Sequence, residues 1–366
     1  MKLAVVVPGG VDRSGEVRVV PAVLALLKRL ASRHEVHVFA LRQEPQDDQW
    51  WLCGARVHNV AGVRMAVAQW RAVAAIAREH RRGRFALVQS VWSGAAGATA
   101  VAAARWLKLP SAVHVAGGEL QALPDIGYGG RLSWRGRLHE ACVLRAADAL
   151  TAASRPILDQ LAALGREGRR LPLGVDLNIW PPQPPRRRQA GEPLRLLQVA
   201  SLNRVKDPGC LLRAVARVPG AELDLVGEDT LGGEMQALAE ALGLGGRVRF
   251  HGFKTQAALQ PFLARAHLHV ITSRHEAGPL AVLEAAVQGV PSIGTAVGHL
   301  AEWSPQAALT VAPGDVPGLA ALLQRLQADE ALRLTLAQEA QRRAVMEDAD
   351  HCHQAFEQLY AELLGR

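Results

Sequence analysis

Residues 273–285 read Ser-Arg-His-Glu-Ala-Gly-Pro-Leu-Ala-Val-Leu-Glu-Ala. They follow a short apolar run that ends at Thr272, and their second half has the composition of a helix. Proline suits the first position of a helix, so we expect this helix to begin at Pro279. Gly278, just before it, lets the backbone approach a neighbour or a ligand closely. The segment therefore predicts a strand–loop–helix unit, the building block of parallel α/β sheets.

The same segment predicts an anion-binding site. The first amides of a helix have no partner inside the helix, so the N–H groups of Leu280 and Ala281 are available to a phosphate. Glu276 lies on the loop and Glu284 lies in the second turn, and carboxylates accept hydrogen bonds from hydroxyl groups. The pattern indicates an extended ligand with hydroxyls at both ends and phosphate between them. A surface acid followed by an unrelated helix-face acid is the alternative interpretation.

Outward from this segment, short apolar runs alternate with helical patterns along the whole chain. Strands are expected over residues 3–7, 36–40, 87–91, 112–116 and 149–152, and then over residues 194–200, 222–226, 248–251, 268–272, 292–294 and 309–311. Strands separated by helices of this length form parallel sheets with right-handed crossovers. The chain is therefore expected to be α/β, with two doubly wound parallel-sheet domains that bind ligands at the carboxyl ends of their strands.

Residues 181–193 are expected to form the linker between the domains. They include four prolines within residues 181–185 and an arginine triplet at 186–188, and proline continues neither a sheet nor a helix. The N-terminal domain is then expected over residues 1–180 and the C-terminal domain over residues 194–349. The helix expected over residues 350–366 packs back on the N-terminal domain in this interpretation.

The charge is distributed unevenly. The 366 residues carry a formal net charge of +8. Residues 1–190 hold 27 Lys and Arg against 14 Asp and Glu (+13), and the remainder holds 15 against 20 (−5). A basic half suggests an anionic partner, such as an acidic lipid surface, a phosphorylated acceptor or nucleic acid. An arginine-rich solvated surface without such a partner is the alternative.

Metal, disulfide and membrane-spanning classes are not favoured. The four cysteines form no Cys-x-x-Cys pair. The longest uncharged stretch of small residues, 93–104, is too short to span a bilayer. We expect a cytoplasmic protein, with peripheral contact at the inner membrane face left open. The basic amphipathic stretch 63–84 fits either a helix lying on an anionic membrane or a packed helix with an arginine-rich outer face.

The chain resembles the family 4 retaining glycosyltransferases, also described as glycosyl transferases group 1. Their signature has two glutamates separated by seven residues, as in Glu276 and Glu284, and residues 283–291 and 298–302 resemble its flanks. Residues 173–176, 225–228 and 250–253 resemble further family turns. The resemblance implies a GT-B fold, in which two Rossmann-like doubly wound domains face a cleft.

The resemblance also implies a set of donor contacts. Glu276 would contact the donor sugar, Glu284 the nucleotide ribose, and the amides after Gly278 the diphosphate. Lys206 matches the family's lysine, but Ser201 stands where arginine is usual. Arg204 would then supply the missing cation from a shifted position. Phe253 follows a turn whose backbone lies near the base in the family.

In the first half, Gly9 and Gly10 follow the first strand, and the family's comparable loop faces the donor phosphate and the acceptor. The full dinucleotide-binding glycine spacing is absent, so the signal is weak by itself. His114 is expected at the end of a strand, where the resemblance places a histidine beside the donor sugar; a buried core histidine is the alternative. Glu119, five residues later, is expected to orient an acceptor hydroxyl.

These observations predict a retaining glycosyltransferase that moves a sugar from a UDP- or GDP-linked donor to a hydroxyl acceptor, in cell-envelope or exopolysaccharide glycan synthesis. It would use no metal and no cofactor beyond this co-substrate. The predicted catalytic residues are Glu276, His114 and Lys206; the donor-binding residues are Gly10, Arg204, Lys206, Phe253, Gly278, Pro279, Leu280 and Glu284; the acceptor-side residues are Gly9 and Glu119.

Three alternatives stay open at this point. The chain could be a donor-binding relative with hydrolase or epimerase activity, one without activity, or a basic nucleic-acid-binding module. Aromatic residues make up only 4% of the chain, which disfavours the last, because single-stranded nucleic acid is usually held by stacked aromatics. We therefore expect a nucleotide sugar and a hydroxyl acceptor as partners, and no nucleic acid. A lipid-linked acceptor and an anionic one both remain open.

Overall fold

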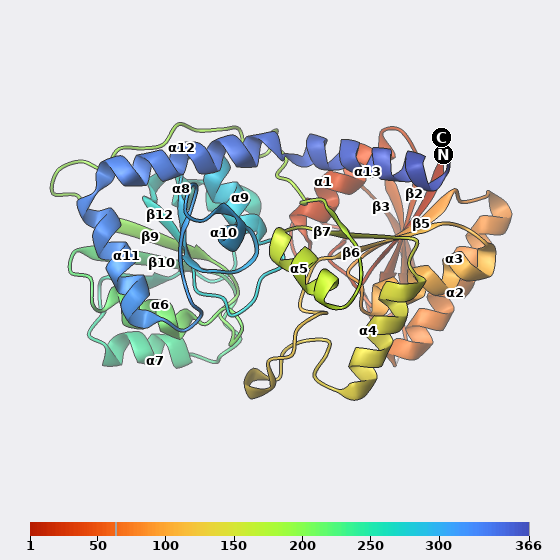
Figure 1. The fold of residues 1–366 in the computed structure, drawn as a ribbon, viewed down its shortest axis with the longest axis horizontal. Helices are drawn as coiled ribbons and strands as arrows, with labels where there is room; N and C mark the ends of the chain where they lie inside the picture. Colours follow the sequence, from red (N-terminus) through yellow and green to blue (C-terminus); the bar gives the residue numbers. More distant parts are fainter. Residues whose placement is uncertain (63, 366) are drawn as a thin grey trace. The chain divides into compact units, whose positions relative to one another are not determined.

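The computed structural model describes every residue except 63 and 366. The chain divides into two compact units, which Figure 1 shows in colours that follow the sequence. Unit 1 holds residues 1–174 and the C-terminal residues from Ala349 onward, and unit 2 holds Val175–Asp348.

Unit 1 is built on an eight-stranded sheet with the order β3-β4-β2-β1-β5-β6-β7-β8. Its strands are β1 (Lys2–Val7), β2 (Glu35–Leu41), β3 (Asp48–Leu52), β4 (Ala55–Val60), β5 (Leu87–Val91), β6 (Ser111–Val115), β7 (Ala149–Ala152) and β8 (Arg169–Arg170). Its helices are α1 (Pro21–Ala31), α2 (Met65–Arg82), α3 (Ala95–Leu107), α4 (Trp134–Ala146), α5 (Arg155–Ala163) and α13 (Ala349–Leu363), with a 3-10 turn at Pro124–Ile126. All neighbouring strands are parallel except β3 and β4.

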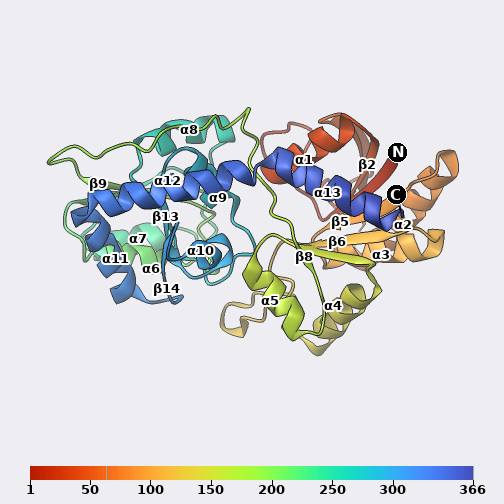
Figure 2. The same cartoon turned by 45° about the horizontal axis from the view of Figure 1, so that its top comes forward.

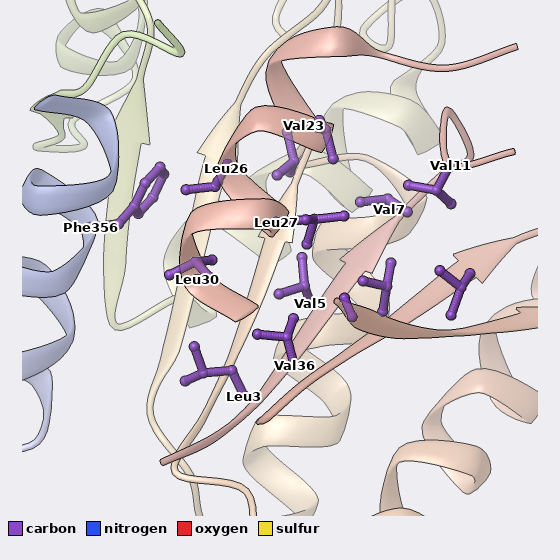
Figure 3. Packing of buried hydrophobic residues seen from close by; sticks show 14 of the residues in the cluster. Leu3, Val5, Val7, Val11, Val23, Leu26, Leu27, Leu30, Val36 and Phe356 are labelled. Atoms are coloured by element: carbon purple, nitrogen blue, oxygen red, sulfur yellow. The ribbon is translucent and has the colours of Figure 1, made fainter. Parts of the chain in front are cut away.

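Helices cover both faces of this sheet, which is why its central strands are buried and mostly apolar, with Gln89 and Ser90 of β5 and His114 of β6 as buried polar residues. On one face, Leu26 and Leu30 of α1 and Phe356 of α13 pack over Leu3 and Val5 of β1 (Figure 3). On the other face, α2 and α3 pack over the alternate residues of the same strands. The C-terminal helix α13 thus contributes to the core of unit 1.

The hairpin of β3 and β4 is the main element that the sequence did not predict. Its two strands are antiparallel and are joined by Cys53 and Gly54, both with positive φ, as a two-residue hairpin requires. The polar residues His58 and Asn59 of β4 are buried. The ring of His58 stacks on that of His37. This tertiary contact allows a strand with a polar sequence to be buried.

Unit 2 contains a six-stranded, fully parallel sheet with the order β11-β10-β9-β12-β13-β14. Its strands are β9 (Leu194–Val199), β10 (Ala221–Val226), β11 (Val248–Phe250), β12 (Leu268–Ile271), β13 (Ser292–Thr295) and β14 (Leu309–Val311). Its helices are α6 (Pro208–Val215), α7 (Glu234–Ala241), α8 (Gln256–Arg265), α9 (Leu280–Val287), α10 (Gly298–Trp303), α11 (Val316–Ala328) and α12 (Glu330–Met346). This is the strand order of the doubly wound dinucleotide-binding fold.

Residues 175–193 are not a free linker between the units. They belong to unit 2, where Trp180 is fully buried in the core and the amide of Gln183 donates to the carbonyl of Val287. The guanidinium of Arg333 donates to the carbonyl of Arg186. The expected boundary at residue 180 therefore lies at Gly174, because apolar and polar contacts hold the proline-rich segment against unit 2. Figure 2 shows this segment running along its own unit.

Candidate functional site

In unit 2, the strand order reverses between β9 and β12, which are hydrogen-bonded neighbours. Ligands of open α/β sheets bind at such a switch point, outside the carboxyl ends of the strands. The loop 200–207 leaves β9 at this point and the loop 272–279 leaves β12. These are the two loops on which the sequence placed Lys206 and Glu276.

The structure brings Lys206 and Glu276 into direct contact. The ammonium Nζ of Lys206 lies 2.5 Å from Oε1 of Glu276, and the hydroxyl of Ser273 donates to the same oxygen at 2.6 Å. The lysine side chain is 25% exposed and the glutamate side chain 12%. Among the described residues no hydrogen-bond donor lies on Oε2 of Glu276, so that oxygen can accept a bond from a ligand hydroxyl.

A network of buried hydroxyls and amides fixes the two loops. The hydroxyl of Thr272 donates to the carbonyl of Lys206 at 2.9 Å and accepts a bond from the Gln198 amide. The side-chain oxygen of Asn203 accepts from the amide of Lys206 at 3.0 Å. On the other side, the hydroxyl of Thr295 donates to the carbonyl of Ser273 at 2.6 Å. The position of the Lys206–Glu276 pair is therefore set by the ends of three strands.

The start of α9 lies next to this pair and differs from expectation by one residue. Pro279 has an extended backbone (ψ 113°) and is the N-cap, so the helix begins at Leu280. No acceptor for the amides of Leu280 and Ala281 occurs in the described part of the chain, which leaves both available to an anion. Gly298 packs against this turn: a Cβ there would lie 2.7 Å from Cδ of Pro279 and 3.2 Å from Cβ of Glu276. Only glycine at 298, which also has a φ of 49°, admits this packing.

Glu284 lies in α9 and is buried, with 6% of its surface exposed. Burial raises the pKa of its carboxyl to about 7. The amide of Gln256 donates to its Oε1 at 3.0 Å and opposes the rise. The buried indole of Trp180 also opposes it, although its Nε1 does not complete a hydrogen bond. Glu284 is thus a buried acid poised to titrate near neutral pH, whereas the sequence suggested an accessible carboxylate.

Two further predicted residues, Arg204 and Phe253, lie on neighbouring loops and do not contact the Lys206–Glu276 pair. Arg204 is exposed and its guanidinium lies 3.4 Å from the carboxylate of Glu234. Ser201, which occupies the position of the missing arginine, is exposed. Phe253 follows β11 and is 55% exposed, and within the described chain it packs in no apolar core. Arg204 and Phe253 are therefore available on the surface, and the structure does not bring either onto Glu276.

In unit 1, the strand order reverses between β1 and β5. The Gly9–Gly10 loop follows β1, and a Cβ at Gly10 would lie only 2.6 Å from Cγ2 of Val20. The loop is closed by the amide of Val11, which donates to Oε1 of Gln43 at 3.2 Å. Gly10 is therefore required for the packing of the loop, and Gly9 lies beside Gln43.

His114 lies one residue before the carboxyl end of its strand, but it is a buried core histidine, the alternative interpretation of the sequence. It is the fourth residue of β6 and is fully buried. Its Nδ1 lies 2.9 Å from the hydroxyl of Thr151, and its ring packs edge-on against Phe356 of α13. Burial lowers the pKa of His114 to about 4. The sequence could not show that the C-terminal helix covers this strand face.

Glu119 lies at the carboxyl edge of the sheet in unit 1, in a cluster that the sequence did not predict. Its Oε1 accepts from the amide of Ser93 at 3.0 Å, and the hydroxyl of Ser93 donates to Oε1 of Glu140 at 2.5 Å. Burial raises the pKa of both carboxyl groups. Trp92, the residue before Ser93, has a φ of 78°. This backbone conformation is unusual for a residue other than glycine and is found mostly at functional sites.

A cavity of about 970 Å³ lies beside the same edge. Gln43 lines it and also touches the Gly9 loop. Arg42 and Arg64 line it too, and no carboxylate pairs with either in the described residues. Arg42 also has a positive φ of 63°. The cavity therefore has two unneutralised cations at the edge of unit 1.

The described residues offer neither a cluster of metal ligands nor a membrane-spanning helix. No group of three or more His, Cys, Asp or Glu side chains is arranged to hold a metal ion. No helix there combines the length and apolarity needed to cross a membrane.

The fold and the site at the switch point of unit 2 define a class of protein with two doubly wound, ligand-binding domains. Two family models cover most of the chain: residues 19–174 match the glycosyl transferase 4-like domain, and residues 182–343 match glycosyl transferases group 1. The chain therefore belongs to the glycosyl transferases group 1, the family that its two-glutamate segment resembles.

Curated relatives match over part of their length. The chain is 36% identical over 131 residues to the lipopolysaccharide core biosynthesis glycosyltransferase LpsE of Rhizobium meliloti (strain 1021), covering 35% of this chain and 38% of that protein. It is 34% identical over 183 residues to D-inositol 3-phosphate glycosyltransferase 1 of Catenulispora acidiphila, covering 44% of each. The matched part thus spans less than half of either relative.

Solved structures share the fold over the whole chain. Sucrose-phosphate synthase from Thermosynechococcus elongatus superposes with a TM-score of 0.84 at 21% identity, over 100% of both chains. HepE from Anabaena, solved in complex with UDP-glucose, superposes with a TM-score of 0.75 at 19% identity, over 99% of this chain and 100% of that one. The chain therefore has the GT-B fold.

Proposed function

We propose that this protein is a retaining glycosyltransferase that transfers a sugar from a nucleoside-diphosphate sugar to a hydroxyl acceptor. The observation that carries the proposal is the contact between Lys206 and Glu276 beside the free amides of α9. The cation and the helix start suit the anionic diphosphate, which is the leaving group, and the carboxylate suits the sugar hydroxyls.

The proposed chemistry is electrostatic. Negative charge grows on the diphosphate as the bond to the anomeric carbon breaks, and preorganised donors stabilise it. Lys206 and the amides of Leu280 and Ala281 supply these donors, so the transfer needs no metal ion. Glu276 holds a sugar hydroxyl through its free Oε2 and fixes the side chain of Lys206 through Oε1. His114 is not included in this set because its ring is fully buried.

A uridine or guanosine diphosphate sugar is the proposed donor. Phe253, exposed beyond β11, offers a face for the base, and Glu284 accepts hydrogen bonds from the ribose hydroxyls once it is ionised. HepE, which shares the fold, was solved with UDP and with UDP-glucose, and this favours uridine as the first donor to test.

The acceptor is proposed to bind unit 1 and to carry an anionic group. The cavity with Arg42 and Arg64 supplies unpaired guanidinium groups, which grip phosphate or carboxylate bidentately. Glu119, whose Oε1 accepts from the amide of Ser93, is the residue we propose to accept a hydrogen bond from an acceptor hydroxyl. LpsE is named for lipopolysaccharide core biosynthesis, and this similarity favours a role in cell-envelope glycan synthesis.

The test is a product analysis with UDP- and GDP-sugars labelled in the sugar, with and without anionic oligosaccharide acceptors. We expect a labelled glycoside with the anomeric configuration of the donor, formed only when acceptor is present and undiminished by a chelator. Donor consumption that yields free sugar alone would show a hydrolase instead. Conversion of the donor to its epimer would equally contradict the proposal.

A further inference from the structure

Helices α2, α3 and α4 form one layer on unit 1, with α3 packed between the other two (Figure 1). Their inner residues pack on the sheet and on each other. The outward-pointing residues of these three helices are called the α2–α4 face below. Its composition is unusual in charge and in exposed apolar area.

The α2–α4 face carries an excess of positive charge. The exposed arginines on the three helices are Arg71, Arg78, Arg81, Arg82, Arg105, Arg135, Arg137 and Arg145. The carboxylates on the described residues of these helices are Glu79 and Glu140, and both are buried. Arg71 pairs with Asp47 from a neighbouring loop, and Arg82 pairs with Glu79 of its own helix. Most of the other guanidinium groups face solvent unpaired, so the face is strongly cationic.

Helix stability does not explain this charge. Arginines near a helix C-terminus, such as Arg81 and Arg145, are favourable to the helix dipole. Arg135 and Arg137, however, lie in the first turn of α4, where positive charge opposes the dipole. Their presence there points to an external anion.

Large apolar side chains protrude among these arginines. Trp70 is 73% exposed, Trp106 62%, Trp134 63% and Leu138 57%, and each comes from one of the three helices. Tryptophan favours the boundary between water and lipid, where its ring is buried and its N–H stays hydrated. Leucine has no such polar group, so its exposure favours a lipid partner over a nucleic acid.

We propose that the α2–α4 face docks on an anionic lipid bilayer, with the arginines on the headgroup phosphates and the tryptophans at the acyl boundary. The arginines attract the anionic surface, and insertion of the three tryptophans and Leu138 into the bilayer strengthens the binding. The surface is distinct from the donor site in unit 2, so the inference stands independently of the proposed function.

The experiment is co-sedimentation of the full chain with phosphatidylcholine vesicles, with and without about one third phosphatidylglycerol. We expect binding only to the anionic vesicles, weakened at least about tenfold by raising the salt to about 0.5 M. The variant R78S/R81S/R137S removes three arginines without a carboxylate partner, and we expect about 10- to 100-fold weaker binding. The control R213S/R217S/R325S makes the same charge change on unit 2 and should bind like the wild type.

A second variant separates lipid insertion from simple charge attraction. W70A/W106A keeps every arginine, and we expect it to bind anionic vesicles several-fold more weakly, with melting and UDP-glucose binding unchanged. Equal binding by the arginine variant and its control would overturn the proposal. Tighter binding to a DNA duplex than to vesicles, lost in the arginine variant, would overturn it in favour of a nucleic-acid partner.

Discussion

Nζ of Lys206 lies 2.5 Å from Oε1 of Glu276, although 70 residues separate them in the sequence. The contact joins the loops that leave β9 and β12, the two strands at the reversal of strand order in unit 2. No hydrogen bond to the second oxygen of Glu276 occurs among the described residues, and this is the atom that the proposed function assigns to the donor sugar. In the proposed function, the pair joins the cation that contacts the diphosphate to the carboxylate that contacts the sugar.

The first prediction separates the roles of the two residues by calorimetry with UDP and UDP-glucose. Lys206→Ala should weaken both ligands about tenfold or more, because it removes the charge partner of the diphosphate. Glu276→Ala should leave UDP nearly unchanged and chiefly lower turnover, about 100-fold. If both variants melted earlier but bound and reacted like the wild type, the contact would be a purely structural ion pair.

The second prediction is a pH dependence of donor binding. Burial raises the pKa of Glu284 to about 7, and ribose hydroxyls donate to its ionised form. Affinity for UDP-glucose should therefore fall about fivefold to tenfold from pH 8 to pH 6, as the free protein takes up a proton that binding must release. UDP-glucose is the right probe because its diphosphate does not titrate in this range. Glu284→Gln should bind weakly at both pH values, and a retained slope in that variant would assign the titration elsewhere.

The third prediction concerns the effect of Glu284 on the stability of the folded protein. A carboxyl with a pKa near 4.5 unfolded and about 7 folded binds more protons when folded between these values. Its ionisation therefore destabilises the fold progressively as pH rises from about 4.5 to 7. Glu284→Gln should melt later than the wild type at pH 8 and show little difference at pH 4.5. Thermal unfolding at several pH values checks this, and a difference independent of pH would contradict it.

The fourth prediction tests the packing of Gly298 on the site. Ala at 298 places a Cβ against Pro279 and Glu276 and strains a positive φ, so the loop of Glu276 must shift. We expect the transfer rate to fall at least about tenfold with a modest loss of stability. Gly245→Ala is the matched control, because a Cβ there meets nothing within 4 Å and φ is ordinary. Equal rates for the two variants would show that this packing does not position Glu276.

The fifth prediction addresses His114. Its folded pKa of about 4 lies below the unfolded value of 6.5, so the folded state binds fewer protons in that window. Stability should fall as pH drops from about 6.5 to 4, and His114→Gln should make the decline shallower. Nucleotide affinity should be unchanged in this variant. A specific loss of UDP-glucose affinity, with stability intact, would restore the donor-side role that the sequence suggested.

The sequence predicted the parts of this molecule that depend on local pattern. All eleven expected strands occur, because each is an apolar run between helices. The hairpin of β3 and β4 was missed because its burial depends on the contact of His58 with His37. Pro279 was misplaced by one residue, since proline fits both the first helical position and, with an extended ψ, the cap before it.

The sequence indicated which residues make up the candidate site, but it did not indicate their burial or their contacts. The spacing of Glu276 and Glu284 is visible in the chain, and the loop of Lys206 follows a predicted strand. The burial of Glu284 under Gln256 and Trp180 joins segments that are 28 and 104 residues away, for which no local signal exists. The cluster of Ser93, Glu119 and Glu140 was hidden for the same reason.

The most direct test of the central claim is thermal unfolding with a panel of nucleoside diphosphates and nucleotide sugars. A ligand that binds only the folded state raises its stability by mass action, by about 2.7 kcal/mol at 100 times Kd. We predict a selective rise in Tm with either uridine or guanosine diphosphates and their sugars, lost in Glu284→Ala and in Lys206→Ala. An unchanged Tm with every member of the panel, at concentrations up to millimolar, would contradict the account.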